Sequence, residues 1–167
     1  STEPWKVTLV DTGESTLTGG RLARVRDYLD DTFCFTYGDG VADVDLQSLV
    51  SHHRRNGLQA TLTAVQPPGR YGALGLEGDL VLQFQEKPDG DGGWINGGYF
   101  VLEPSVFDLL DGDSCTWEDE PLIGLAQNGQ LNAFFHYGFW QPMDTLRDRQ
   151  KLEDLWASGQ APWKVWS

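Results

Sequence analysis

The sequence has 167 residues, 40% of them hydrophobic and 22% charged, which is the composition of one globular domain with a buried core and excludes a disordered chain. It contains 12 Lys and Arg and 25 Asp and Glu, which gives a net charge of -13. This charge excludes sequence-independent binding to nucleic-acid phosphates, so a phosphate ligand would need local cations or a metal. The presence of only two cysteines, Cys34 and Cys115, and the lack of any long apolar run predict a cytoplasmic protein with no disulfide framework, no cysteine zinc site, no membrane span and no nucleic-acid partner.

The first third of the chain alternates strand-like and helical patterns, which predicts an α/β domain. Residues 6–10 are predicted as a buried strand, and because no element precedes this strand we expect the chain to be N-terminally truncated. A turn-rich loop leads from it into a short helix over residues 22–29. Residues 33–37 are predicted as a buried central strand, and residues 45–56 as a helix that Asp45 caps.

The rest of the chain predicts an antiparallel hairpin region followed by helices and one more strand. Strands are predicted at residues 61–65, 74–76, 80–85, 94–102 and 131–136, and helices at residues 104–110, 118–128 and 145–156. Thr116 is the expected cap of the helix over 118–128, while the buried stripe of the last helix is predicted to be Leu146, Leu152, Leu155 and Trp156. Residues 138–142 are predicted as a loop. With no internal repeat and no linker, residues 1–167 are predicted to form a single domain.

An aspartate between two glycines, Gly38-Asp39-Gly40, directly follows the strand predicted at residues 33–37. Ligands of open α/β sheets bind at the carboxyl ends of strands, and glycine lets a phosphate approach the backbone. A carboxylate at this point suits Mg²⁺, which prefers oxygen ligands and is commonly shared with substrate phosphates. The alternative is a plain turn, in which Asp and Gly are both favoured.

A second aspartate, Asp144, stands just before the last predicted helix. It is a candidate metal ligand, and its alternative role is that of a helix N-cap, where Asp is common. Nothing in spacing or periodicity indicates that Asp39 and Asp144 meet in space.

Polar residues also stand where one strand ends and the next begins. Glu86 can accept hydrogen bonds from sugar hydroxyls, Lys87 can pair with a phosphate, and Asn96, beside Gly97, can both donate and accept. The alternative is a hairpin with a solvated Glu and Lys at its edge.

The segment Thr16-Leu17-Thr18-Gly19-Gly20-Arg21 leads from a loop into a helix. Amides at a helix start favour anions, and an arginine can bind a phosphate through two hydrogen bonds. The segment matches neither a Walker loop nor the GxGxxG pattern, so a capped turn is the alternative.

The histidines and tryptophans are interpreted as structural. His52 and His53 are neighbours on a predicted helix and cannot face one metal, and His136 has no partner at ligand spacing. The seven tryptophans are assigned to packing or subunit contact and not to carbohydrate stacking.

Six segments, taken in order, together resemble the glucose-1-phosphate cytidylyltransferase family, also called the CDP-glucose pyrophosphorylases, within the sugar nucleotidyltransferase superfamily. They are TGGR at 18–21, TYGDG at 36–40, PPGRYGAL at 67–74, FQEKP at 84–88, INGGYF at 95–100 and FWQPMDTLRD at 139–148. The Gly-rich phosphate loop with which that family begins has no counterpart here. The chain therefore resembles the later two-thirds of such an enzyme, and we expect this fragment alone to be inactive.

The resemblance implies a fold and a reaction. The fold is Rossmann-like, with a mixed, mainly parallel central sheet and an added antiparallel hairpin region. The reaction turns CTP and α-D-glucose 1-phosphate into CDP-glucose and pyrophosphate with Mg²⁺, in a homo-oligomer.

The resemblance also implies roles for single residues. Asp39 and Asp144 would ligate Mg²⁺ and, with Lys87, form the catalytic set. Lys87 would hold the sugar phosphate, with Glu86, Asn96 and Gly97 around the sugar. The nucleotide would be bound by Thr16, Thr18, Gly19, Arg21 and Gly38.

Two rival functions remain open. A sibling enzyme would use dTTP or UTP in place of CTP, and a nucleotide competition assay separates the two. A non-catalytic module would bind a sugar nucleotide without turnover, and the presence of both Asp39 and Asp144 argues against it.

Overall fold

The computed structural model describes residues 5–67, 73–77, 80–85 and 93–166. The chain divides into two compact units. The first unit comprises Ser1–Phe33, Leu58–Ala60 and Leu102–Leu131, and the second unit comprises Cys34–Gly57, Thr61–Val101 and Asn132–Ser167. Within the described ranges, no helix is both long and apolar enough to span a membrane.

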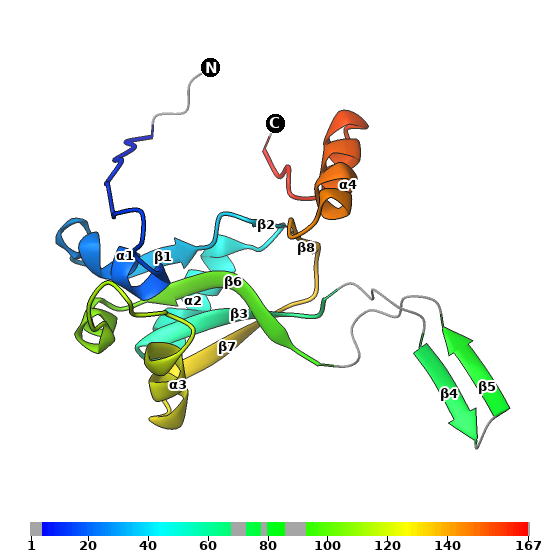
Figure 1. The fold of residues 1–167 in the computed structure, drawn as a ribbon, viewed down its shortest axis with the longest axis horizontal. Helices are drawn as coiled ribbons and strands as arrows, with labels where there is room; N and C mark the ends of the chain where they lie inside the picture. The colour runs from blue at the N-terminus through cyan, green and yellow to red at the C-terminus, as the bar shows by residue number, and fades with distance from the viewer. Residues whose placement is uncertain (1–4, 68–72, 78–79, 86–92, 167) are drawn as a thin grey trace. The chain divides into compact units, whose positions relative to one another are not determined.

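The central sheet has four strands in the order β1-β6-β3-β7 (Figure 1). These strands are β1 (Phe33–Thr36), β6 (Ile95–Leu102), β3 (Ala60–Val65) and β7 (Leu131–His136). Their directions follow from the backbone hydrogen bonds at their ends.

β6 is antiparallel to both of its neighbours in the sheet. The amide of Tyr37, just after β1, donates to the carbonyl of Gly98 near the start of β6. The amide of Glu103, just after β6, donates to the carbonyl of Gln59, just before β3. The amide of Ala60 bonds the carbonyl of Gln130, so β3 and β7 start side by side and run parallel. β1, β3 and β7 therefore point one way and β6 the other, which confirms the predicted mixed α/β sheet.

Helix α2 (Leu46–Asn56) belongs to the second unit, and its ends agree with the sequence. The side chain of Asp45 accepts a hydrogen bond from the amide of Ser48, and Gly57 ends the helix with φ 63°. The inward face carries Leu49, which is fully buried, and His53, which is bonded to the hydroxyl of Thr61. His53 is thus a hydrogen-bonded core residue, as predicted.

Two short strands that the sequence analysis did not predict, one of them in the predicted loop over residues 138–142, form a second ladder in the second unit. β2 (Gly40–Ala42) pairs antiparallel with β8 (Trp140–Pro142), and Gly40 lies opposite Pro142. Three residues are too few to show a strand period, so only the folded chain reveals this pairing. Beyond β8, helix α4 (Leu146–Ala157) starts in a capping box made by Thr145 and Asp148.

The predicted hairpin region is confirmed as an antiparallel pair. β4 (Ala73–Glu77) pairs with β5 (Leu80–Gln85), with a register shift between Gly75 and Leu76.

The first unit contains two α-helices and two 3-10 helices around its own core. They are α1 (Thr18–Arg24), η1 (Arg26–Tyr28), η2 (Pro104–Leu109) and α3 (Glu120–Gln127). Trp117 is fully buried, Leu22 and Leu125 are nearly so, and the rings of Phe33 and Phe107 stack at 5.5 Å. Trp117, Phe33 and Phe107 are thus used for packing.

Several expectations about single elements were wrong. Residues 5–10 form no strand, and Leu9 is 92% exposed, because no other described segment pairs with them. β1 is an edge strand of the described sheet and not a central one. Asp119, not Thr116, occupies the N-cap position of α3. In α4 only Leu152 is buried, while Leu146 and Trp156 are exposed.

Candidate active site

A pocket of about 180 Å³ lies in the second unit, where β1 ends and the β2–β8 ladder begins. Its walls come from three stretches of chain that are remote in sequence: residues 36–40, residues 96–99 and residues 140–144. The lining residues include Asp39, Asn96, Gly97, Tyr99 and Asp144. Four of the predicted site residues are therefore brought to one place.

The β2–β8 ladder is what joins the two aspartates. Asp39 immediately precedes β2, and its carbonyl accepts a hydrogen bond of 2.7 Å from the amide of Met143. Asp144 is the next residue after Met143, so both carboxylates stand at the same end of the ladder and both line the pocket. Thr145 and not Asp144 caps α4, which removes the alternative role considered for Asp144.

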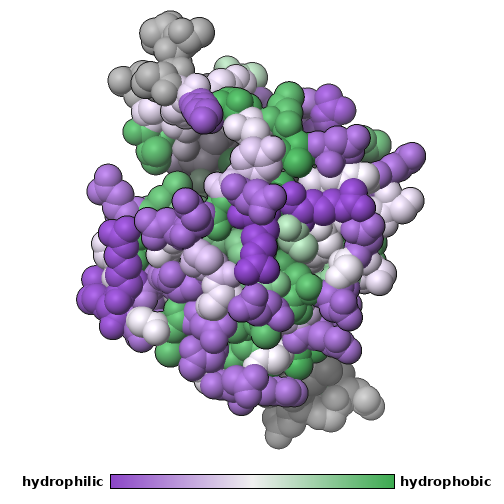
Figure 2. Space-filling model, turned by 90° about the vertical axis from the view of Figure 1, so that its left-hand side faces the viewer, coloured by the Kyte–Doolittle hydropathy of each residue, from purple (hydrophilic) through white to green (hydrophobic). Residues whose placement is uncertain are grey.

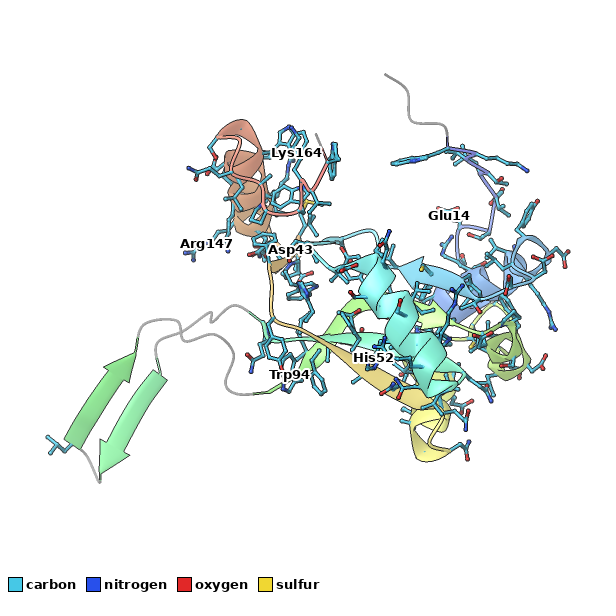
Figure 3. The ribbon with its side chains drawn as sticks, turned by 180° about the vertical axis from the view of Figure 1, so that it is seen from behind. Glu14, Asp43, His52, Trp94, Arg147 and Lys164 are labelled. Atoms are coloured by element: carbon cyan, nitrogen blue, oxygen red, sulfur yellow. The ribbon has the colours of Figure 1, made fainter. Side chains whose placement is uncertain are left out.

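The opposite end of the same ladder is closed by a second set of bonds. The amide of Asp43, just after β2, donates to the carbonyl of Phe139, just before β8. The Nε2 atom of His136 lies 3.0 Å from the carboxylate of Asp43, the residue labelled in Figure 3. The same atom lies 3.1 Å from the Phe139 carbonyl. Because both neighbours are acceptors, this nitrogen carries the proton. The ladder is therefore fixed at the end away from the aspartates as well.

Two aromatic side chains tie the pocket walls together. The Tyr99 hydroxyl donates to the Gly40 carbonyl at 3.0 Å, and the indole N–H of Trp140 donates to the Gly97 carbonyl at 2.9 Å. Burial raises the pKa of Tyr99 above its ordinary value, so the hydroxyl keeps the proton that this bond needs. These bonds link β6 to both strands of the ladder.

Asn96 and the two glycines after it shape the remaining wall. The Asn96 side chain accepts from the Gly98 amide at 2.9 Å and donates to the Tyr37 hydroxyl at 3.3 Å. A Cβ atom at Gly97 would lie 2.7 Å from Val65 Cγ1, and one at Gly98 would lie 2.8 Å from Tyr37 Cδ2. Gly98 also has φ 78°, so glycine is required here by space and by backbone conformation.

The residues at the pocket fit a magnesium ion that a substrate helps to hold. Within the described ranges, no group of three or more His, Cys, Asp and Glu side chains could enclose a metal. Mg²⁺ usually takes only one or two carboxylates and fills its other positions with water and phosphate oxygens. Asp39 and Asp144, both exposed at the pocket, supply two hard oxygen ligands.

The residues predicted to bind the nucleotide fall in both units. Gly38 stands beside Asp39 in the second unit. The others belong to the first unit and form bonds inside it. Arg21 donates to the Thr12 hydroxyl and the Glu14 carbonyl, and the Thr18 hydroxyl donates to Glu118. Thr16 is buried, and the Gly19 amide donates to the Cys115 carbonyl. Their role toward a nucleotide stays a prediction.

Glu86 and Lys87 lie outside the described residues, so their roles also stay predictions. In contrast, the pocket adds residues that the sequence analysis gave no role. Tyr37, Tyr99 and Trp140 all line it. Tyr37 and Trp140 stand inside TYGDG and FWQPMDTLRD, two of the segments that resemble the family. This position in the sequence is the signal that could have identified them as site residues.

Comparison with known proteins gives a consistent classification. Glucose-1-phosphate cytidylyltransferases of Salmonella typhi and Salmonella typhimurium are each 62% identical to the chain over 166 residues, which is 98% of this chain. The chain spans 65% of the length of these curated relatives. A solved UDP-glucose pyrophosphorylase in complex with UDP-glucose superposes with a TM-score of 0.65 at 14% identity, over 90% of this chain and 65% of that one.

The chain therefore shares its fold, built on a mixed α/β sheet, with that solved structure. The pattern of the nucleotidyl transferase family matches residues 12–133. The chain belongs to the nucleotidyl transferase family.

Proposed function

We propose that the protein to which this chain belongs transfers a cytidylyl group from CTP to α-D-glucose 1-phosphate, producing CDP-glucose and pyrophosphate. The observation that carries the proposal is the β2–β8 ladder, which places Asp39 and Asp144 at one end of the same pocket. The 62% identity to glucose-1-phosphate cytidylyltransferases supports the choice of nucleotide and sugar.

The reaction forms one bond and breaks one. An oxygen of the sugar phosphate attacks the α-phosphorus of the nucleotide, and the bond to the bridging oxygen opposite breaks, so that pyrophosphate leaves with the electron pair. No protein nucleophile is needed, because the sugar phosphate oxygen is itself the attacking group. The main barrier is the approach of two anions. Positioning and charge neutralisation are what the protein supplies.

Each proposed residue has a part in that positioning. Asp39 and Asp144 would hold Mg²⁺, which when bound neutralises phosphate charge and orients the phosphates. Lys87 would bind the sugar phosphate as a point charge, and Glu86 would accept from sugar hydroxyls. Asn96 and Gly97, which line the pocket, would lie against the sugar. The chain's charge of -13 makes a bound cation necessary, because free CTP would otherwise be repelled.

Turnover is tested by measuring pyrophosphate release from CTP and glucose 1-phosphate, with dTTP and UTP as competitors. The assay uses the 167-residue chain and the full product of its reading frame. Release with CTP, abolished by chelation of Mg²⁺, is expected from the full product. Preference for dTTP or UTP would favour the sibling enzyme, and sugar-nucleotide binding without pyrophosphate release would favour a non-catalytic module.

We also infer self-association. Trp156 and Trp166, near the C-terminal end, are each 54% exposed, and large exposed aromatic side chains are typical of subunit contacts. Sedimentation of the full product tests this, and a monomer at every concentration would contradict it.

A further inference from the structure

A buried amide side chain lies in strand β8, on the stretch of chain that leads to Asp144. Gln141 is the middle residue of β8, and its side chain is 2% exposed. Its carbonyl oxygen accepts a hydrogen bond of 2.6 Å from the Lys151 ammonium on α4. Its amide nitrogen donates to the Asp148 carboxylate and to the Pro142 carbonyl, each at 3.1 Å. Every polar atom of this side chain is therefore in use.

Asp148 carries this chain of bonds on to the residue beside Asp144. One oxygen of its carboxylate receives the Gln141 bond, and the other accepts from the Thr145 amide at 3.1 Å and the Thr145 hydroxyl at 2.7 Å. The Asp148 amide in turn donates to the Thr145 hydroxyl. Gln141 thus holds the carboxylate that fixes the backbone of Thr145.

Asp144 consequently stands between two fixed backbone amides. On one side the Met143 amide is bonded to the Asp39 carbonyl, and on the other the Thr145 amide is bonded to Asp148. The first bond ties the backbone before Asp144 to Asp39. The second ties the backbone after Asp144 to Asp148. Together they restrain the backbone from which the Asp144 side chain leaves.

The order of charges along these bonds adds to their strength. The Lys151 cation lies on the amide oxygen and the Asp148 anion on the amide hydrogen, so the amide is polarised from both ends and each bond strengthens the next. Lys151 reaches Asp148 only through this neutral amide.

We propose that Gln141, polarised by Lys151, is a positioning residue that orients Asp144 for binding Mg²⁺ through Asp148 and Thr145. The inference rests on the proposed function. Supporting residues behind metal ligands typically contribute about 10- to 100-fold to metal affinity. Gln141 acts through Asp148 and Thr145 and not on Asp144 itself, so the lower figure is expected.

The test measures metal affinity and turnover in two variants with a matched control. Gln141→Leu removes both ends of the amide without adding charge, and Lys151→Met removes the cation from an exposed side chain. Gln150→Leu is the control, because Gln150 on the same helix donates to Asp154 at 2.9 Å in the same Gln-to-Asp manner, on an exposed face. The full product is titrated with Mn²⁺ in the presence of CTP, followed by electron spin resonance, and its Mg²⁺ dependence of pyrophosphate release is recorded.

The half-saturating metal concentration is expected to rise about tenfold in Gln141→Leu and severalfold in Lys151→Met. No change is expected in Gln150→Leu. The Lys151 result is diagnostic, because loss of a positive charge near the site would by itself tighten metal binding. Unchanged or tighter binding in Lys151→Met, or equal behaviour of Gln141→Leu and Gln150→Leu in an active enzyme, overturns the inference alone. An unsubstituted protein with neither Mn²⁺ binding nor turnover overturns the proposed function as well.

Discussion

The start of α1 in the first unit and the end of the β2–β8 ladder in the second unit both carry predicted site residues, but their polar groups are used differently. At α1 the Thr18 hydroxyl donates to Glu118 and accepts from the Trp117 amide, and the Arg21 guanidinium is bonded to its own loop. At the ladder, the described part of the chain offers the Asp39 carboxylate no hydrogen-bond donor. On the face shown in Figure 2, hydrophilic residues surround smaller hydrophobic areas.

The two regions thus differ in what their polar groups do. Those at the start of α1 stabilise the fold through hydrogen bonds, whereas the Asp39 carboxylate is exposed at the pocket, where a ligand can reach it. An exposed carboxylate without a partner contributes little to stability and is available to a cation. A hydroxyl with one donor and one acceptor already satisfied has its bonding capacity largely used. Substitutions at the pocket are therefore expected to change activity, and substitutions at the start of α1 are expected to change stability.

The largest effect is expected when Asp39 and Asp144, the two aspartates that line the pocket, lose their charge. Asp39→Asn and Asp144→Asn should each lower turnover of the full product about 1000-fold, because a metal that neutralises phosphate charge contributes several kcal/mol to the barrier. Pyrophosphate release is measured at saturating Mg²⁺, and the melting temperature is recorded beside it.

The matched control is Asp113→Asn in the first unit. The Asp113 carboxylate pairs with Arg24 at 2.9 Å on the surface, so its loss should leave turnover unchanged. Near-normal activity in both ladder variants would remove the metal role of the pocket.

A second prediction concerns space and not charge. Gly98→Ala should destabilise the chain by about 2 kcal/mol, because a Cβ atom would meet the Tyr37 ring and the backbone has φ 78°. Gly124→Ala lies inside α3 with open space around it, so it should stabilise the chain by about 0.5–1 kcal/mol. Urea unfolding of both variants gives the comparison, and a shift of the same sign in both would contradict it.

The sequence predicted most elements of the fold because their signals are local. The N-cap Asp45 and the C-terminal Gly57 bracket α2, and β3, β6 and β7 lie within a residue of their predicted ranges. Asp39 and Asp144 were each predicted as a metal ligand from the residues next to them, which is also a local signal.

What joins the site is not local. β2 and β8 are three residues each and about a hundred residues apart along the chain, so no periodicity reveals that they pair. Residues 5–10 show the opposite error, since their alternating apolar pattern predicts a strand whatever the chain offers it to pair with. Pairing partners, and with them the meeting of the aspartates, appear only in the folded chain.

A third prediction addresses the first unit. Thr18→Val keeps the shape of the side chain but removes the acceptor of the Trp117 amide and the donor to Glu118. The free energy of unfolding should fall by about 1 kcal/mol, the usual net worth of such bonds. Calorimetry or urea unfolding measures it. A loss of nucleotide affinity with unchanged stability would instead show that the Thr18 hydroxyl serves the ligand, as the family resemblance implies.

The smallest effect is expected at a carboxylate that is already used for capping, and it depends on pH. The Ser48 amide donates to the Asp45 carboxylate at 3.0 Å and the Ser48 hydroxyl at 2.7 Å, and these bonds lower the pKa of Asp45 below its ordinary 3.8. A lowered folded-state pKa stabilises the fold above the unfolded-state pKa, and this stabilisation is lost as the pH falls through the folded-state value. Asp45→Asn keeps the cap but not the charge, so its melting temperature should lie slightly below that of the unsubstituted chain at neutral pH and converge with it in acid. A constant difference from neutral pH to about pH 2.5 would show that the Asp45 charge contributes nothing through Ser48, and the contrast between capping carboxylates and pocket carboxylates would then rest on geometry alone.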